Sequence, residues 1–136
     1  MRAPRLIVGT DLAKVADVAA AIERHGERYV TRIFTPSEIA YCREAPHLEA
    51  ERFAARFAAK EAAAKVLRPD GAWPDWHSIE IRRQPGGWCD IVLHGIAAER
   101  AEAAGVVSMS VSMSHDGEYA IAVVTAELNE HFGGTT

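Results

Sequence analysis

The stretch RFAAKEAAAKVL, from Arg56 to Leu67, decides how this chain folds. Alanine is the strongest helix former, so a run this rich in alanine predicts the interior of a helix. The pattern extends back to about Leu48, and Pro69 breaks it, so we expect one long helix from Leu48 to Leu67. The run also carries a glutamate and several cations. A helix that only packs in the hydrophobic core does not need such charges. These charges predict a functional face.

The charged residues of this helix fall on two neighbouring stripes. Phe57, Glu61 and Lys65 are spaced four residues apart and share one face, while Arg56 and Lys60 share the adjoining one. One interpretation is a solvated helix face, in which a Glu61 to Lys65 pair contributes about 0.2–0.5 kcal/mol. The other is a ligand site, in which cations surround a functional carboxylate.

A second carboxylate lies near the N-terminus. The apolar run Leu6 to Val8 predicts a buried strand that ends in a turn at Asp11, with a helix following from Leu12 to Ile22. Taken alone, Asp11 at this place is typical of a helix N-cap. Taken with Glu61, it predicts a Mg²⁺ site, because such sites use one or two carboxylates and leave the other positions to water and phosphates. Arg56, Lys60 and Lys65 would then neutralise phosphate charge.

The rest of the sequence predicts an α+β fold with an antiparallel sheet. Thr35 to Glu38 forms a capping-box signature for a short helix. Further segments follow in order: two hairpin strands (78–82 and 90–94), a helix (96–104), a strand that alternates serine with valine and methionine (107–114), and a last strand (119–125). Ser114 and His115 end the serine strand, and by themselves they are ordinary polar residues.

Composition limits the classes of function. The 136 residues fit one domain, which we expect over residues 1–130 with a disordered tail at 131–136. A formal net charge of -4 argues against nucleic-acid binding. Cys42 and Cys89 have no spacing that indicates a disulfide framework or a zinc site. No apolar run is long enough for a signal peptide or a membrane span, so we expect a soluble, cytoplasmic protein.

Four segments together resemble the holo-[acyl-carrier-protein] synthases. They are VGTDL at 8–12, RIFT at 32–35 with Glu38, RFAAKEA at 56–62 with Lys65, and VSMSH at 111–115 followed by Tyr119 and Ala120. The resemblance covers residues 6 to 126 in order and spacing. It implies the 4′-phosphopantetheinyl transferase fold, in which an antiparallel sheet packs against a long helix. It also implies a homotrimer with each active site at a subunit boundary.

The resemblance further implies a Mg²⁺-dependent transfer of 4′-phosphopantetheine from coenzyme A to a serine of an apo acyl carrier protein. By match to the family's motifs, Asp11 and Glu61 are the expected metal ligands and, with Lys65 beside the diphosphate, the catalytic residues. Glu61 would take the serine proton directly or, as we favour, through a metal-bound water. The expected coenzyme contacts are Arg56, Phe57, Lys60, Lys65, Ser114 and His115, with Arg68 reaching the 3′-phosphate.

The partner and two alternatives stay open at this point. Asp17 stands where the family often has a carrier-docking cation, although Arg24 and Arg28 are available, so either a fatty-acid or a polyketide carrier is expected. One alternative is a non-catalytic module that binds coenzyme A or a carrier protein with the same fold. The other is a structural oligomer whose charged helix is merely solvated.

Overall fold

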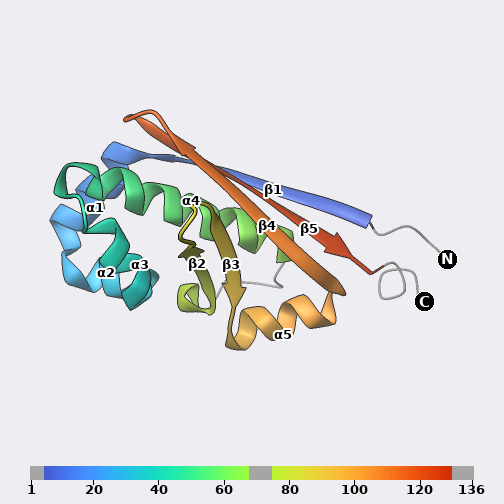
Figure 1. Ribbon diagram of the computed structural model, residues 1–136. Coiled ribbons are helices and arrows are strands. Elements are labelled where there is room, and N and C mark those ends of the chain that lie inside the picture. Colours follow the sequence, from blue (N-terminus) through green and yellow to red (C-terminus); the bar gives the residue numbers. More distant parts are fainter. Residues whose placement is uncertain (1–4, 68–74, 130–136) are drawn as a thin grey trace.

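The computed structural model describes residues 5–67 and 75–129 and contains one three-stranded antiparallel sheet. Its strands are β1 (Arg5–Lys14), β4 (Val106–His115) and β5 (Tyr119–Leu128), and β5 lies in the middle. Figure 1 shows these three strands as one long layer that runs across the helix α4 (Glu49–Leu67). The expected combination of an antiparallel sheet and a long helix is therefore confirmed.

The sheet can approach α4 closely because both surfaces carry small residues. The alanines of α4 at 54, 55, 58, 59, 62 and 63 are buried, and so are those of β5 at 120, 122 and 126. Gly9 of β1 marks the closest approach, because a Cβ atom there would lie 2.5 Å from the Ala62 carbonyl oxygen and 2.9 Å from Val66 Cγ2. Glycine at this position lets the strand lie directly on the helix.

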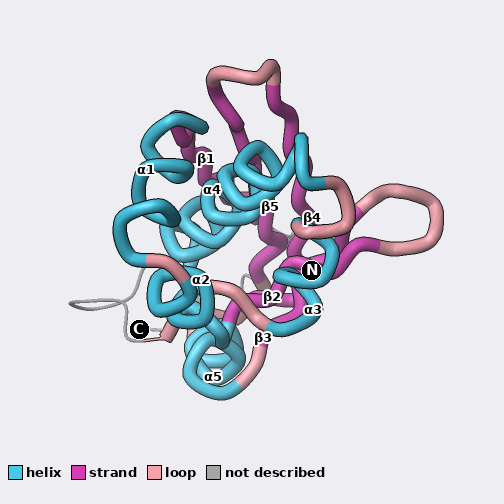
Figure 2. The backbone as a smooth tube through the Cα atoms, turned by 90° about the vertical axis from the view of Figure 1, so that its left-hand side faces the viewer, coloured by secondary structure: helices cyan, strands magenta, loops and turns pink. Residues whose placement is uncertain are grey.

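A second group of elements covers the other side of α4. The hairpin of β2 (Ile79–Arg83) and β3 (Cys89–Leu93) is followed by α5 (Gly95–Ala103). The short helices are α1 (Val15–His25), α2 (Glu27–Ile33), α3 (Pro36–Cys42), η1 (Pro46–Leu48) and η2 (Trp76–Ser78). Figure 2 shows the helices gathered beside the sheet, with the β4–β5 hairpin projecting above them. None of the helices in the described part of the chain is long and apolar enough to cross a membrane.

A buried ion pair joins these layers. The capping box predicted at Thr35 is present, so Glu38 accepts a hydrogen bond from the Thr35 backbone N–H. Its other carboxylate oxygen accepts from the backbone N–H of Ile81 at 2.7 Å. Lys60 Nζ lies 2.9 Å from Glu38 Oε1, and both side chains are fully buried. Glu38 therefore ties α3, β2 and α4 together.

The structure corrects the expected N-terminal boundaries. The first strand does not end in a turn at Asp11, because its pairing with β5 continues to Lys14, opposite Tyr119. Helix α1 begins at Val15 with Lys14 as its N-cap, so Asp11 is not a helix cap. The apolar spacing that began at Leu12 is typical of a helix, but the hydrogen bonds offered by β5 hold this segment in the sheet.

Candidate functional site

Asp11 and Lys65 meet where β1 crosses α4. Asp11 lies on the same side of the strand as buried Gly9 and Ala13, which is the side that faces the helix. Lys65 Nζ lies 3.2 Å from Asp11 Oδ1 and donates a hydrogen bond to the Thr10 carbonyl oxygen at 2.8 Å. The Asp11 side chain is 20% exposed and that of Lys65 is 54% exposed. The pair therefore forms a charged cluster that solvent can reach.

Glu61 lies one helical turn before Lys65 and belongs to the same cluster. Partial burial raises the pKa of Glu61, the nearby Asp11 carboxylate raises it further, and Lys65 opposes both. Two carboxylates that repel each other in a partly buried place favour the binding of a cation between them.

The donor set of this cluster suits Mg²⁺. Carboxylate oxygens are the hard ligands that this ion prefers, and it commonly uses one or two of them beside phosphate groups. Within residues 5–67 and 75–129, no group of three or more His, Cys, Asp or Glu side chains could hold a metal. Two carboxylates alone leave most coordination positions to water and to substrate oxygens, so Asp11 and Glu61 fit such an ion.

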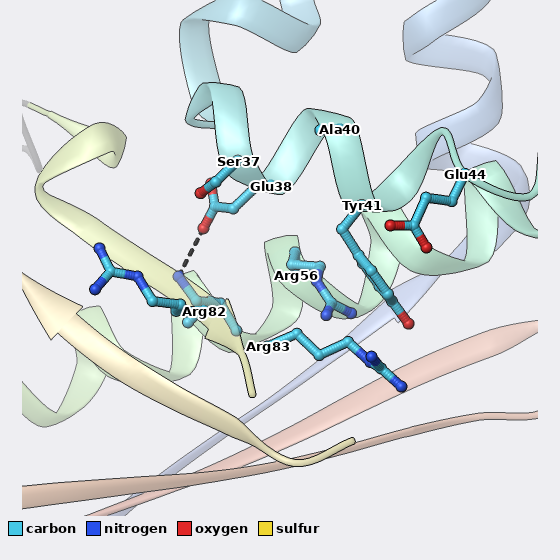
Figure 3. Close-up of a pocket in the computed structure, with 9 residues that line it drawn as sticks. Ser37, Glu38, Ala40, Tyr41, Glu44, Arg56, Arg82 and Arg83 are labelled. Atoms are coloured by element: carbon cyan, nitrogen blue, oxygen red, sulfur yellow. Dashed lines mark hydrogen bonds between the residues drawn. The ribbon is translucent and has the colours of Figure 1, made fainter. Parts of the chain in front are cut away.

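Arg56 lines a separate cavity of about 310 Å³ between α3, α4 and β2. Its guanidinium stacks 4.2 Å from the centre of the Tyr41 ring, and Arg83 lies 5.2 Å from the same ring (Figure 3). One Arg56 nitrogen donates to Cys89 Sγ at 3.5 Å, whereas the buried Nε has no hydrogen-bond partner among the described residues. A buried guanidinium N–H usually has a partner, and the lining of this cavity combines arginines with the carboxylates of Glu38 and Glu44.

Sequence reasoning missed two residues of this cavity. Tyr41 lies in the short helix that follows the capping box, and Arg83 directly follows the expected strand at 78–82. Neither has a spacing that links it to Arg56, and only the packing of α3 and β2 against α4 brings the three together. Phe57 lies on the neighbouring face of α4, where its ring centre is 5.9 Å from that of Trp76.

Lys60 is buried in the core, and the expectation that it contacts the coenzyme stays a prediction. Besides its contact with Glu38, its ammonium donates to the backbone carbonyl oxygens of Trp76 at 2.9 Å and Ile79 at 2.6 Å. Burial lowers the pKa of Lys60, although the Glu38 carboxylate opposes this effect. The three ammonium hydrogens thus all have partners in the core.

Ser114 and His115 end β4 and point to opposite sides of the sheet, because Ser114 pairs with Ile121 and His115 with Ala120. They line a cavity of about 260 Å³ together with Leu12, Asp116, Tyr119 and Ile121. Leu12 neighbours Asp11 in sequence but points to the opposite side of β1, because side chains alternate along a strand. His115 lies on the helix-facing side of the sheet, as Asp11 does, because the two residues pair with Ala120 and Ala122 of β5. Arg68, the remaining expected coenzyme contact, lies outside the described residues.

Comparisons with known proteins agree on one family. The model of the 4′-phosphopantetheinyl transferase superfamily matches residues 7–124. A holo-[acyl-carrier-protein] synthase of Koribacter versatilis is 43% identical over 125 residues, which are 90% of this chain and 99% of the relative. One from Moorella thermoacetica is 41% identical over 122 residues, covering 90% of this chain and 94% of the relative.

Solved structures show the same fold. The crystal structure of the Helicobacter pylori holo-[acyl-carrier-protein] synthase in complex with coenzyme A matches with a TM-score of 0.76 and 30% identity, over 88% of this chain and 99% of that one. The holo-ACP-synthase from Plasmodium yoelii matches with a TM-score of 0.80 over 94% of this chain and 99% of that one. At 24% identity, the second match concerns the fold alone.

Proposed function

Because this chain belongs to the holo-[acyl-carrier-protein] synthase family of 4′-phosphopantetheinyl transferases, we propose that it carries out that family's reaction. In this reaction the hydroxyl of a carrier-protein serine attacks the phosphorus next to pantetheine in coenzyme A. A bond forms between the serine oxygen and this phosphorus, the diphosphate link breaks, and adenosine 3′,5′-bisphosphate leaves. The serine proton passes to a base.

The observation that carries this proposal is the cluster of Asp11, Glu61 and Lys65 at the crossing of β1 and α4. We propose that Asp11 and Glu61 hold Mg²⁺, which when bound would offset the negative charge of the diphosphate. Lys65 provides a fixed positive charge for the phosphate that leaves. A non-catalytic module that only binds coenzyme A or a carrier would not need both carboxylates beside this lysine.

The coenzyme is proposed to contact two further places. The unpartnered Nε of Arg56 and the guanidinium of Arg83 suit a phosphate group in the cavity beside Tyr41. Ser114 and His115 offer hydrogen bonds to the ribose-phosphate and adenine end of the coenzyme. Phe57 contributes an apolar surface between the cluster and Arg56.

A homotrimer is proposed because the outer face of the sheet is apolar and exposed. The exposed fractions are 72% for Leu6, 67% for Val8, 60% for Leu12, 42% for Ile121 and 37% for Val123. A contiguous apolar patch of this kind usually marks an interface between proteins. The exposed serines of β4 continue this face, and each active site is proposed to lie at a boundary between two subunits.

The carrier partner is proposed to dock on α1 and α2. Arg24, Arg28 and Arg32 are exposed there and would attract an acidic carrier protein. Asp17 is exposed on α1 and would repel an acidic carrier protein. The affinities for fatty-acid and polyketide carriers are therefore expected to depend on the charge of the carrier surface that faces Asp17.

The test is intact-mass spectrometry of an apo carrier protein after incubation with this protein, coenzyme A and Mg²⁺, with a chelator control. A gain of one phosphopantetheine group that requires the metal supports the proposal, and parallel reactions with both carrier classes rank them. If neither carrier gains mass but coenzyme A raises the melting temperature, the binding module becomes the better description.

A further inference from the structure

Glu51 and His115 make a close side-chain contact that no part of the reaction described above uses. Glu51 lies in the first turn of α4, and His115 is the last residue of β4. His115 Nδ1 lies 2.7 Å from Glu51 Oε2, and the side chains are 37% and 23% exposed. Figure 1 shows the turn between β4 and β5 at the same end of the molecule as the start of α4.

The contact with Glu51 gives the two nitrogens of the imidazole ring different roles. An ionised carboxylate can only accept hydrogen bonds, so Nδ1 must carry a proton while it contacts Glu51. The contact also opposes rotation of the ring about its side-chain bonds, and Nε2 is the nitrogen left for a ligand. His115 lines the cavity that it shares with Ser114 and Tyr119.

We propose that Glu51 is a positioning residue, which holds the His115 ring so that Nε2 is presented to coenzyme A. The inference rests on the proposed function, because it takes from it the role of His115 in binding the coenzyme. The inference adds Glu51, which belongs to α4 and acts on the coenzyme only through His115 of β4. The same logic applies wherever a carboxylate orients an imidazole from its far nitrogen.

The first measurement is steady-state kinetics of four variants. Replacing Glu51 by alanine is expected to raise KM for coenzyme A by about fivefold to tenfold with kcat within about twofold, because binding and not chemistry is affected. Glu51→Gln keeps an oxygen that can accept from Nδ1, so its KM should stay within about twofold of the unaltered protein. Glu51→Ala combined with His115→Ala should be no worse than His115→Ala alone, because residues that act together are not additive.

Glu49→Ala is the matched control. Glu49 is also acidic and lies in the same first turn of α4, but it pairs with Arg43 at 3.3 Å instead of His115. Both alanine variants lose a similar contribution to helix stability, so a merely structural effect would appear in both. An increase in KM for Glu49→Ala equal to that for Glu51→Ala would overturn the proposal.

Nitrogen NMR of the His115 ring gives a readout that does not depend on catalysis. Nδ1 is expected to be protonated in the unaltered protein, and Glu51→Ala should shift the ring toward the form protonated only at Nε2. A ring whose nitrogen signals are identical in the two proteins would overturn the proposal. If the unaltered protein transfers nothing, the proposed function fails, while calorimetric affinity for coenzyme A and these spectra still decide the role of Glu51.

Discussion

Lys60 and Lys65 lie on the same helix but in opposite environments. Lys60 Nζ lies 2.9 Å from Glu38 Oε1 among fully buried side chains, whereas Lys65 Nζ lies 3.2 Å from Asp11 Oδ1 where its side chain is 54% exposed. Helical spacing places the two residues on different stripes of α4, and the β2–β3 hairpin and α3 cover only one of these stripes. Two lysines of one motif therefore have separate tasks, one structural and one available to a ligand.

This difference predicts opposite effects for two matched substitutions. Lys60→Met leaves the Glu38 carboxylate buried without its partner and should lower the free energy of unfolding by about 3–5 kcal/mol. Lys65→Met removes an exposed pair and should cost less than about 1 kcal/mol, while it lowers transfer activity. Urea denaturation and turnover measure the two effects. Equal stabilities for the two variants would contradict the burial of Lys60.

Glu61→Gln should preserve the fold and lose activity. The amide has nearly the same shape as the carboxylate, but it carries no negative charge for Mg²⁺. Loss of a metal ligand or general base of this kind typically lowers kcat/KM by about 10²-fold or more. Turnover at several Mg²⁺ concentrations is the measurement, and Glu99→Gln on α5 is the control. Normal turnover in Glu61→Gln would remove this residue from the mechanism.

Gly9→Ala should destabilise the protein and misplace Asp11. The new Cβ would lie 2.5 Å from the Ala62 carbonyl oxygen, so β1 must move away from α4. Such overpacking typically costs about 1–3 kcal/mol. The control is Gly86→Ala, whose Cβ would meet only the exposed Trp88 side chain, at 3.0 Å. Thermal unfolding should separate the two variants, and a neutral Gly9→Ala would show that this contact is looser.

Local sequence signals predicted much of this fold. The alanine-rich helix expected at Leu48 to Leu67 is observed as Glu49–Leu67, and the capping box at Thr35 is present with both of its hydrogen bonds. The hairpin expected at 78–82 and 90–94 is observed as Ile79–Arg83 and Cys89–Leu93. Each of these elements is specified by the residues within it, which is why the local sequence pattern was sufficient to predict it.

Features that depend on distant partners were not predictable in this way. The strand around Asp11 has apolar spacing typical of a helix, and its pairing with β5 decides its conformation. The position of Lys60 in the sequence shows on which stripe of α4 it lies. It does not show that α3 and the β2–β3 hairpin cover that stripe. The stacking of Arg56 and Arg83 on Tyr41 likewise requires three elements to meet. The sequence predicted Asp11 and Glu61 as a pair, and their role as metal ligands stays a prediction.

Glu80 predicts a stability that falls in acid. Burial opposes its ionisation, but hydrogen bonds from Ser37, His94 and Arg82 outweigh burial and lower the pKa of Glu80 to about 2. Because the pKa of Glu80 is lower in the folded state, its ionised form stabilises the fold at pH values above the ordinary pKa of 4.5. This contribution disappears as the pH falls from 4.5 toward 2. Because solvent screens part of these interactions, the contribution is at most roughly 3 kcal/mol.

Glu80→Gln should therefore be less stable than the unaltered protein at pH 7, and the difference should shrink as the pH approaches 2. Urea denaturation at a series of pH values measures it, with the exposed Glu23→Gln as the control. A difference that stays constant from pH 7 to pH 3 would show that the ionised form of Glu80 is not favoured by folding.

The apolar outer face of the sheet predicts that assembly and activity are lost together. Val8 is 67% exposed in the single chain, so Val8→Lys should leave the subunit folded but put a charge into the proposed interface. Light scattering should show trimers for the unaltered protein and smaller species for Val8→Lys, with little transfer activity. Ile96→Lys on α5 is the control, because Ile96 is also exposed, at 45%, but lies away from the sheet.

Mixing two inactive proteins tests whether the active site is shared between subunits. Glu61→Gln removes the Asp11 cluster's second carboxylate, and His115→Ala removes the histidine of the other cavity, so each pure trimer should transfer poorly. In a mixed trimer, some boundaries would combine an intact Glu61 from one chain with an intact His115 from its neighbour. Activity should therefore return after the two proteins are unfolded and refolded together. If each site were built within one chain, every site would carry one of the two defects, and refolding together would restore nothing.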